Sequence, residues 1–130
     1  MPNSLFTHPI HLGLGAKAVA QPEFTEMEWY QDYGRRHAAD AAEGRLVSLY
    51  RFEKSWDSWE MHPAGDEVVL CIEGSLTLHQ QLPDRSERTV TLGPGEYAIN
   101  APGMWHTADC SEPVTALFIT AGEGTTHRPR

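Results

Sequence analysis

The stretch Trp59-Glu60-Met61-His62-Pro63-Ala64-Gly65-Asp66-Glu67, followed by Gly74, decides the interpretation of this chain. In an extended strand, residues i and i+2 point to the same side, so Glu60 and His62 should face one cavity. Residues 63–66 contain a proline and a glycine and predict a turn. That turn would bring Glu67, at the start of the next strand, back toward the same cavity. Three potential metal donors can therefore converge.

A second stretch, from Gly93 to His106, supplies a fourth candidate. It places His106 shortly after the tight turn expected at Pro102-Gly103. Imidazole nitrogens and carboxylate oxygens together suit divalent iron, manganese, nickel or zinc, whereas magnesium and calcium prefer oxygen ligands alone. The sequence therefore predicts a site for one divalent metal ion of the first group.

Around these two stretches the chain consists of short β-rich runs separated by glycine and proline, which is typical of a sandwich or barrel. The expected strands are residues 46–52, 67–72, 75–81, 87–92, 96–101, 105–110 and 114–120. They form two halves with a similar strand-turn-strand rhythm, as in jelly rolls. The predicted fold class is all-β.

The chain resembles the cupin superfamily, whose two motifs are G-x5-H-x-H-x3,4-E-x6-G and G-x5-P-x-G-x2-H-x3-N. His62, Glu67 and Gly74 match the second histidine, the glutamate and the closing glycine of the first motif. Matches to the second motif are Gly95, Gly103 and His106. The resemblance covers roughly residues 46–120. It implies a cupin barrel of two facing antiparallel sheets, with His62, Glu67 and His106 as metal ligands.

Three positions depart from the family pattern. Glu60 stands where the family has its leading histidine, so it is either a fourth ligand or a general base beside the metal. Ala101 replaces the motif proline, although Pro102 follows directly and should preserve the turn. Cys110 replaces the final asparagine and lies on the same strand face as His106, where it could line the cavity.

The chain divides into an N-terminal arm with a short helix (residues 1–44), the barrel (45–121) and a C-terminal tail (122–130). Thr25 and Glu28 have the spacing of a capping box, which predicts a helix beginning there. Gly44 is its expected end. The tail is either disordered or a strap over the barrel mouth that presents His127 or Arg128 to a substrate.

The remaining histidines and the tryptophans carry less specific signals. His8, His11, His37 and His79 have no partners in register, and we expect them to make surface or local contacts. The tryptophans near the ligand segments should pack the barrel, or else form aromatic walls around a ligand. These tryptophans are Trp56, Trp59 and Trp105.

Composition narrows the possible partners. The net charge is −8, from 18 acidic and 10 basic side chains, which disfavours nucleic acid and anionic lipid. No apolar run approaches the roughly 20 residues that cross a bilayer, and no signal peptide is recognisable. Cys71 and Cys110 are far apart and form no C-x-x-C pair, which suits a cytoplasmic protein.

The leading functional hypothesis is a metal-dependent enzyme acting on a small organic molecule, of oxygenase, isomerase or lyase type. The alternative is a non-catalytic cupin that binds a sugar or another small ligand, with a structural metal or none. Related barrels commonly dimerise by exchanging or pairing edge strands, so we expect a homodimer.

Overall fold

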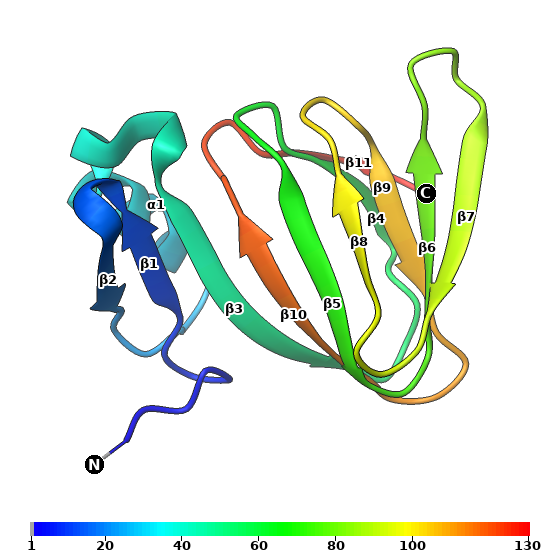
Figure 1. The fold of residues 1–130 in the computed structure, drawn as a ribbon, viewed down its shortest axis with the longest axis horizontal. Helices are drawn as coiled ribbons and strands as arrows, with labels where there is room; N and C mark the ends of the chain where they lie inside the picture. The colour runs from blue at the N-terminus through cyan, green and yellow to red at the C-terminus, as the bar shows by residue number, and fades with distance from the viewer. Residues whose placement is uncertain (1) are drawn as a thin grey trace.

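The computed structural model describes residues 2–130 and contains two antiparallel sheets that face each other (Figure 1). The six-stranded sheet has the order β2-β1-β3-β10-β5-β8, and the five-stranded sheet has the order β11-β4-β9-β6-β7. The strands are β1 (Ile10–Gly13), β2 (Lys17–Ala20), β3 (Arg45–Phe52), β4 (Ser58–Met61), β5 (Glu67–Glu73), β6 (Leu76–Gln81), β7 (Glu87–Leu92), β8 (Tyr97–Asn100), β9 (His106–Asp109), β10 (Val114–Thr120) and β11 (Thr126–Pro129). The all-β prediction is confirmed.

The core fills the space between the two sheets. Alternate residues of the central strands point inward, and those of the six-stranded sheet include Val69, Cys71, Ala116 and Phe118. Leu76, Leu78 and Ala108 meet them from the opposite sheet and are at most 1% exposed. Burial of this apolar surface is the main favourable term in folding. It also holds the two sheets in a fixed relation at the end where the candidate ligands lie.

The single helix predicted from Thr25 to Gly44 is wrong in its start and its continuity. The α-helix α1 covers Glu28–Arg36, and its N-cap residue is Met27, which makes no side-chain cap. A separate 3-10 segment, Ala38–Glu43, follows and ends at Gly44. The chain bends at His37, whose ring stacks on His11, and this bend lets Asp40 reach the other edge of the His11 ring.

The two ends of the chain add three strands, of which the sequence hinted only at an extended piece at residues 11–14. Within the region expected to be an arm, β1 and β2 form a hairpin that pairs with β3 through β1 and extends the six-stranded sheet. The C-terminal segment forms β11, which pairs with β4 at the edge of the five-stranded sheet. Figure 1 shows the N-terminal hairpin and the β6–β7 hairpin at opposite ends of the molecule.

No helix within residues 2–130 combines the length and the apolarity that are needed to cross a membrane.

Candidate metal centre

Four side chains meet between the sheets, and they are the four predicted from the sequence. Glu60 lies in β4 and pairs with His106 at the start of β9. His62 follows β4 directly, and Glu67 begins β5 after the intervening turn. One donor atom from each lies within 4.8 Å of the others. The strand alternation and the turn therefore place the side chains as expected.

The spacing of the donor atoms matches the edges of a small coordination polyhedron. His62 Nε2 lies 2.8 Å from Glu60 Oε1 and 3.1 Å from Glu67 Oε2, and His106 Nε2 lies 3.2 Å from Glu67 Oε1. The contact between His106 Nε2 and Glu60 Oε1 is longer, at 3.6 Å. Ligands about 2.1 Å from one ion are about 3.0 to 3.4 Å apart in octahedral or tetrahedral geometry.

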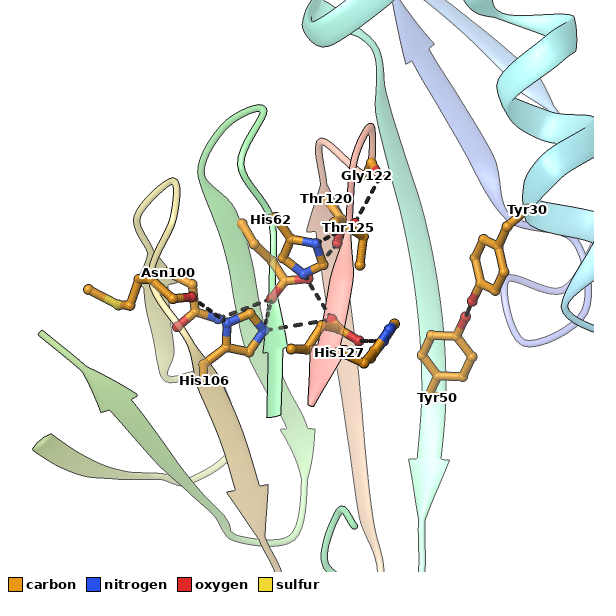
Figure 2. A network of polar contacts seen from close by, with 12 residues as sticks. Tyr30, Tyr50, His62, Asn100, His106, Thr120, Gly122, Thr125 and His127 are labelled. Atoms are coloured by element: carbon orange, nitrogen blue, oxygen red, sulfur yellow. Dashed lines mark hydrogen bonds and ion pairs between the residues drawn. The ribbon is translucent and has the colours of Figure 1, made fainter. Parts of the chain in front are cut away.

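The C-terminal segment determines which nitrogen of His62 can bind a metal. The Thr125 hydroxyl donates its single proton to the carbonyl oxygen of Gly122, at 2.8 Å. It can therefore only accept from His62, whose Nδ1 lies 2.8 Å away. In the neutral ring the proton is thus on Nδ1, and the lone pair of Nε2 points to the cluster (Figure 2).

His106 is oriented in the same way by the main chain. Its Nδ1 lies 3.3 Å from the carbonyl oxygen of Met104, which can only accept. The Nε2 atoms of His106 and His62 are both buried, and neither makes a hydrogen bond to any described residue. Buried polar atoms normally have a partner. Two such nitrogens that converge on the carboxylates of Glu60 and Glu67 fit a metal ion well, because the ion would take the place of their protons.

Glu67 is held from both sides by neutral donors. Its Oε1 accepts from the amide of Asn100 at 3.0 Å, and its Oε2 accepts from the Thr120 hydroxyl at 2.6 Å. The Gln80 amide donates in turn to Asn100 Oδ1. Glu67 is 2% exposed, so this network fixes its carboxylate without neutralising the charge that a cation needs.

Glu60 differs from the other three because it reaches solvent. Its side chain is 25% exposed, and its Oε2 lies 2.9 Å from Nε2 of His127 on β11. Its Oε1 faces the two buried histidines. One oxygen is therefore available to the cluster, and the other connects the cluster to an exposed histidine.

The four groups strongly perturb one another's ionisation. Burial opposes charge on His62, but the carboxylates Glu60 and Glu67 outweigh it and raise the His62 pKa to about 9. The same balance raises the His106 pKa to about 9. Burial also opposes charge on Glu67, but the imidazoles outweigh it and lower the Glu67 pKa to about 2. The Glu60 pKa is likewise held well below its usual range.

A divalent ion suits this charge balance. Without a metal, two protonated histidines offset two carboxylates. A divalent ion replaces two protons with an equal charge, while both imidazoles become neutral ligands. The residues present therefore fit the metal that the sequence implies, and two nitrogens with two carboxylates suit iron, manganese, nickel or zinc.

The fold of this chain occurs in solved structures, although no protein-family model and no curated protein matches its sequence. Hydroquinone 1,2-dioxygenase from Sphingomonas sp. TTNP3, solved with 4-hydroxybenzoate bound, is 19% identical, with a TM-score of 0.52 over 58% of this chain and 59% of that chain. Oxalate oxidase in complex with glycolate is 12% identical, with a TM-score of 0.55 over 63% of this chain and 45% of that chain. Oxalate decarboxylase is 17% identical, with a TM-score of 0.56 over 74% of this chain and 26% of that chain.

The chain has the cupin fold. It spans less than two thirds of the length of each of these three proteins. At these identities the likeness shows the fold alone, and the chemistry of the site depends on this chain's own residues.

The motif glycines of the cupin pattern have a structural reason here. Gly74 has a φ of 91°, and a Cβ added to it would lie 2.5 Å from the carbonyl oxygen of Pro113. Gly103 has a φ of 77°, in the turn just before His106. The substitution at Ala101 leaves that turn intact, since Met104 N still donates to Ala101 O. Cys110 packs against the core and is not one of the four clustered groups.

The three tryptophans separate into two environments. Trp56 packs into the core, and its ring centroid lies 6.2 Å from that of His106. Trp59 and Trp105 instead hold the guanidinium of Arg128, at 5.3 and 4.4 Å from their ring centroids. Trp59 and Trp105 therefore anchor β11.

The expectation of a surface or local contact is wrong for His11. The ring is 1% exposed, and its nitrogens contact Tyr33 Oη and Asp40 Oδ2, both at 2.6 Å. His11, His37 and Asp40 are close enough to be a second metal cluster. However, both nitrogens of His11 are engaged, and the Lys17 ammonium lies 3.1 Å from Asp40. This group therefore links the N-terminal hairpin to the helical segment.

Sequence reasoning missed most of the groups that support the ligands. Thr125, Thr120 and Asn100 carry no motif of their own, because their roles depend on which strands become neighbours. The sequence predicts a role for His127 only if the C-terminal tail forms a strap over the barrel mouth. The available signal was the spacing of Thr125 and His127, which stand two residues apart after Gly122 and Gly124, as expected for a turn followed by an extended segment.

Proposed function

We propose that this cupin binds one divalent transition metal and uses it to catalyse a reaction on a small organic molecule. The observation that carries the proposal is the pair of buried Nε2 atoms, on His62 and His106, that converge on Glu67 without hydrogen-bond partners. A divalent metal held there would supply Lewis-acid or redox chemistry toward an oxygen-containing substrate.

Glu60 is the residue of this chain best suited to handle a proton. Its carboxylate adjoins the metal ligands through Oε1 and contacts the exposed His127 through Oε2. In this role Glu60 would be a general base at the edge of the site, and His62, Glu67 and His106 would hold the ion. The names of the three similar proteins denote reactions of small organic molecules, which agrees with the proposed substrate class.

A second candidate is a binding cupin with a structural metal. The observation that favours it is that Glu60 lies as near to His62 as Glu67 does. The distance from His62 Nε2 is 2.8 Å to Glu60 Oε1 and 3.1 Å to Glu67 Oε2. If Glu60 coordinates, a tetrahedral ion has four protein ligands and no position for a substrate. The ligand count around the metal thus discriminates the two functions.

The test of the proposal begins with protein stripped of metal and reloaded with iron, manganese, nickel or zinc in turn. We expect about one ion per chain in the wild type and in His79→Ala, a matched control whose histidine bonds Asp109 and Thr89 away from the cluster. We expect His106→Ala to lose the ion. Stoichiometric metal in His106→Ala would overturn the ligand assignment.

Catalysis is tested by screening each reloaded protein for oxygen uptake and product formation with small phenols, carboxylic acids and sugars. Turnover that requires one metal and is lost in His106→Ala supports the enzyme. Saturable binding of one of these compounds with no turnover under any metal would favour the binding function instead.

A further inference from the structure

Strand β7 carries an arginine at a position that faces the inside of the barrel. On this strand Leu92 and Val90 pack in or against the core, and strand alternation makes Arg88 the next inward residue. Arg88 pairs with Gln80 of β6, which is 1% exposed. Arg88 itself is exposed, and β7 is an edge strand of the five-stranded sheet (Figure 1). A charged residue at an inward position is unusual unless its polar atoms have partners.

The guanidinium of Arg88 is bound to a neutral oxygen. Its Nε and Nη2 atoms both donate to Gln80 Oε1, at 3.0 and 2.6 Å. Arg88 forms no ion pair with any carboxylate of residues 2–130. A guanidinium has only donors. Two bonds from it to one amide oxygen therefore fix the direction in which that amide points.

From Gln80 a chain of hydrogen bonds leads to the candidate metal centre. Gln80 Nε2 donates to Asn100 Oδ1 at 2.8 Å, and Asn100 Nδ2 donates to Glu67 Oε1 at 3.0 Å. Gln80 Nε2 also donates to the carbonyl oxygen of Ile99, at 3.0 Å. Both side-chain amides belong to residues that are 1% exposed, so a lost bond is not readily replaced by one to water.

The two ends of this chain allow only one direction of hydrogen bonding. Arg88 can only donate, and an ionised Glu67 can only accept. If the Gln80 amide were turned over, its NH2 group would face the guanidinium and its oxygen would face the oxygen of Asn100. Asn100 could relieve that contact only by turning its own oxygen toward Glu67. The Ile99 carbonyl favours the same direction, because it also can only accept.

We infer that Arg88 is a positioning residue of the metal centre, which sets the direction of the Gln80 and Asn100 amides and so holds an N–H group on Glu67. This inference rests on the proposed binding of a divalent metal by Glu67. Groups that orient a ligand without touching the metal commonly change metal affinity. Hydrogen bonds in such a chain also polarise one another, which strengthens the bond to Glu67.

The chain conveys orientation without bringing the charge of Arg88 to the metal position. Two amides separate Arg88 from Glu67. A guanidinium bound directly to Glu67 would neutralise the carboxylate that a cation needs and would repel the ion. Loss of a positive charge near a cation site should by itself tighten binding, whereas loss of the chain should weaken it. The two effects of Arg88 therefore have opposite signs and can be separated.

The first test is the zinc affinity, measured by competition with a coloured chelator. Arg88→Met removes the donor and the charge, and should weaken zinc binding about tenfold. Arg85→Met, at an exposed position of the same β6–β7 hairpin, removes an equal charge but no bond of the chain. This matched control should bind zinc at least as tightly as the wild type. Arg88→Lys keeps a charged group that only donates, and should restore the wild-type affinity.

A double-mutant cycle tests whether Arg88 acts through Gln80. Gln80→Met is neutral and of similar size, breaks the chain, and should also weaken zinc binding about tenfold. In that background Arg88→Met should cause no further weakening, because the chain is already broken. Additive losses would overturn the inference. So would an Arg88→Met protein that binds zinc as tightly as Arg85→Met, or an Arg88→Lys protein as weak as Arg88→Met.

The side-chain amide signals of Asn100 test the chain without a metal. In the metal-free protein, NMR should show that these amide protons exchange slowly with water. Arg88→Met should speed up the exchange and shift the signals, although the partners of Asn100 are Gln80 and Glu67. Arg85→Met should change neither, and unchanged signals in Arg88→Met would overturn the inference. A wild type that binds no divalent metal would contradict the proposed function, and the Asn100 signals would still decide whether the chain operates.

Discussion

At the scale of single residues, the candidate metal centre depends on hydrogen bonds made by atoms that do not touch the metal position. Thr125 and the Met104 carbonyl each occupy Nδ1 of one histidine, so that both Nε2 atoms face Glu67. Asn100 and Thr120 hold the two Glu67 oxygens. The ligand types were predictable from sequence spacing, whereas these orienting contacts depend on strand neighbours that spacing does not reveal.

Thr125→Val should weaken metal binding about 10- to 100-fold, because Val cannot accept the Nδ1 proton and the His62 ring loses its fixed orientation. Thr125→Ser keeps the hydroxyl and should bind metal like the wild type. Competition with a coloured chelator measures the dissociation constants. Equal affinities for the Val and Ser variants would contradict the role of this hydrogen bond.

Metal affinity should rise with pH between about 6 and 9. The pKa values of His62 and His106 are both raised to about 9 without metal, so at pH 7 an incoming ion must displace their protons. Each displaced proton makes affinity increase about tenfold per pH unit, until the pH exceeds the raised pKa values. Calorimetry in buffers of different ionisation enthalpy should detect close to two released protons. Release of none at pH 7 would be inconsistent with the charge balance described above.

At the scale of elements, β11 connects the end of the chain to the site. It carries Thr126–Pro129, pairs with β4, and brings His127 to Glu60. Arg128 lies over the rings of Trp59 and Trp105, and Arg130 makes two contacts with Asp109. The strand therefore supports the candidate metal centre.

Arg128→Ala should lower the free energy of unfolding by about 1 to 2 kcal/mol, because it removes two cation–π contacts and the hydrogen bond to Gln81. Lys54→Ala, at an exposed position, should change it by less than about 0.5 kcal/mol. Urea unfolding measures both. A loss no larger than that of Lys54→Ala would show that the indole contacts contribute little.

The central strands were predictable, and the terminal elements were not. Residues 46–52, 75–81, 87–92 and 114–120 were expected as strands because they alternate or are rich in β-branched side chains, and they agree closely with β3, β6, β7 and β10. β1, β2 and β11 are short strands of four residues at or next to the sheet edges, and their pairing depends on the partner surface. The prediction of one continuous helix was wrong because the chain bends at His37. The bend is accompanied by the hydrogen bond between His11 and Asp40, which are 29 residues apart, and by the stacking of His37 on His11.

At the scale of the whole molecule, the metal and the fold should stabilise each other. The donors come from β4, β5, β9 and the residue after β4, so unfolding disperses the site. A ligand that binds only the folded state at about 100 times its dissociation constant adds about 2.7 kcal/mol. For a domain of this size this corresponds to a rise of about 10 °C in the melting temperature.

Scanning calorimetry with and without the reloaded metal checks this expectation. The shift should be present in the wild type and in His79→Ala and absent from His106→Ala. An equal shift in His106→Ala would indicate that the metal binds elsewhere on the molecule.

The central claim is that His62, Glu67 and His106 hold one divalent metal in the cupin barrel. A crystal structure of the metal-loaded protein, with anomalous diffraction recorded at the metal edge, tests it most directly. The expected result is one strong anomalous peak about 2.0 to 2.2 Å from both Nε2 atoms and from a Glu67 oxygen. The distance to Glu60 would then decide whether it is a ligand or a base. A peak at His11, His37 and Asp40 instead, or none between the two sheets, would contradict the account.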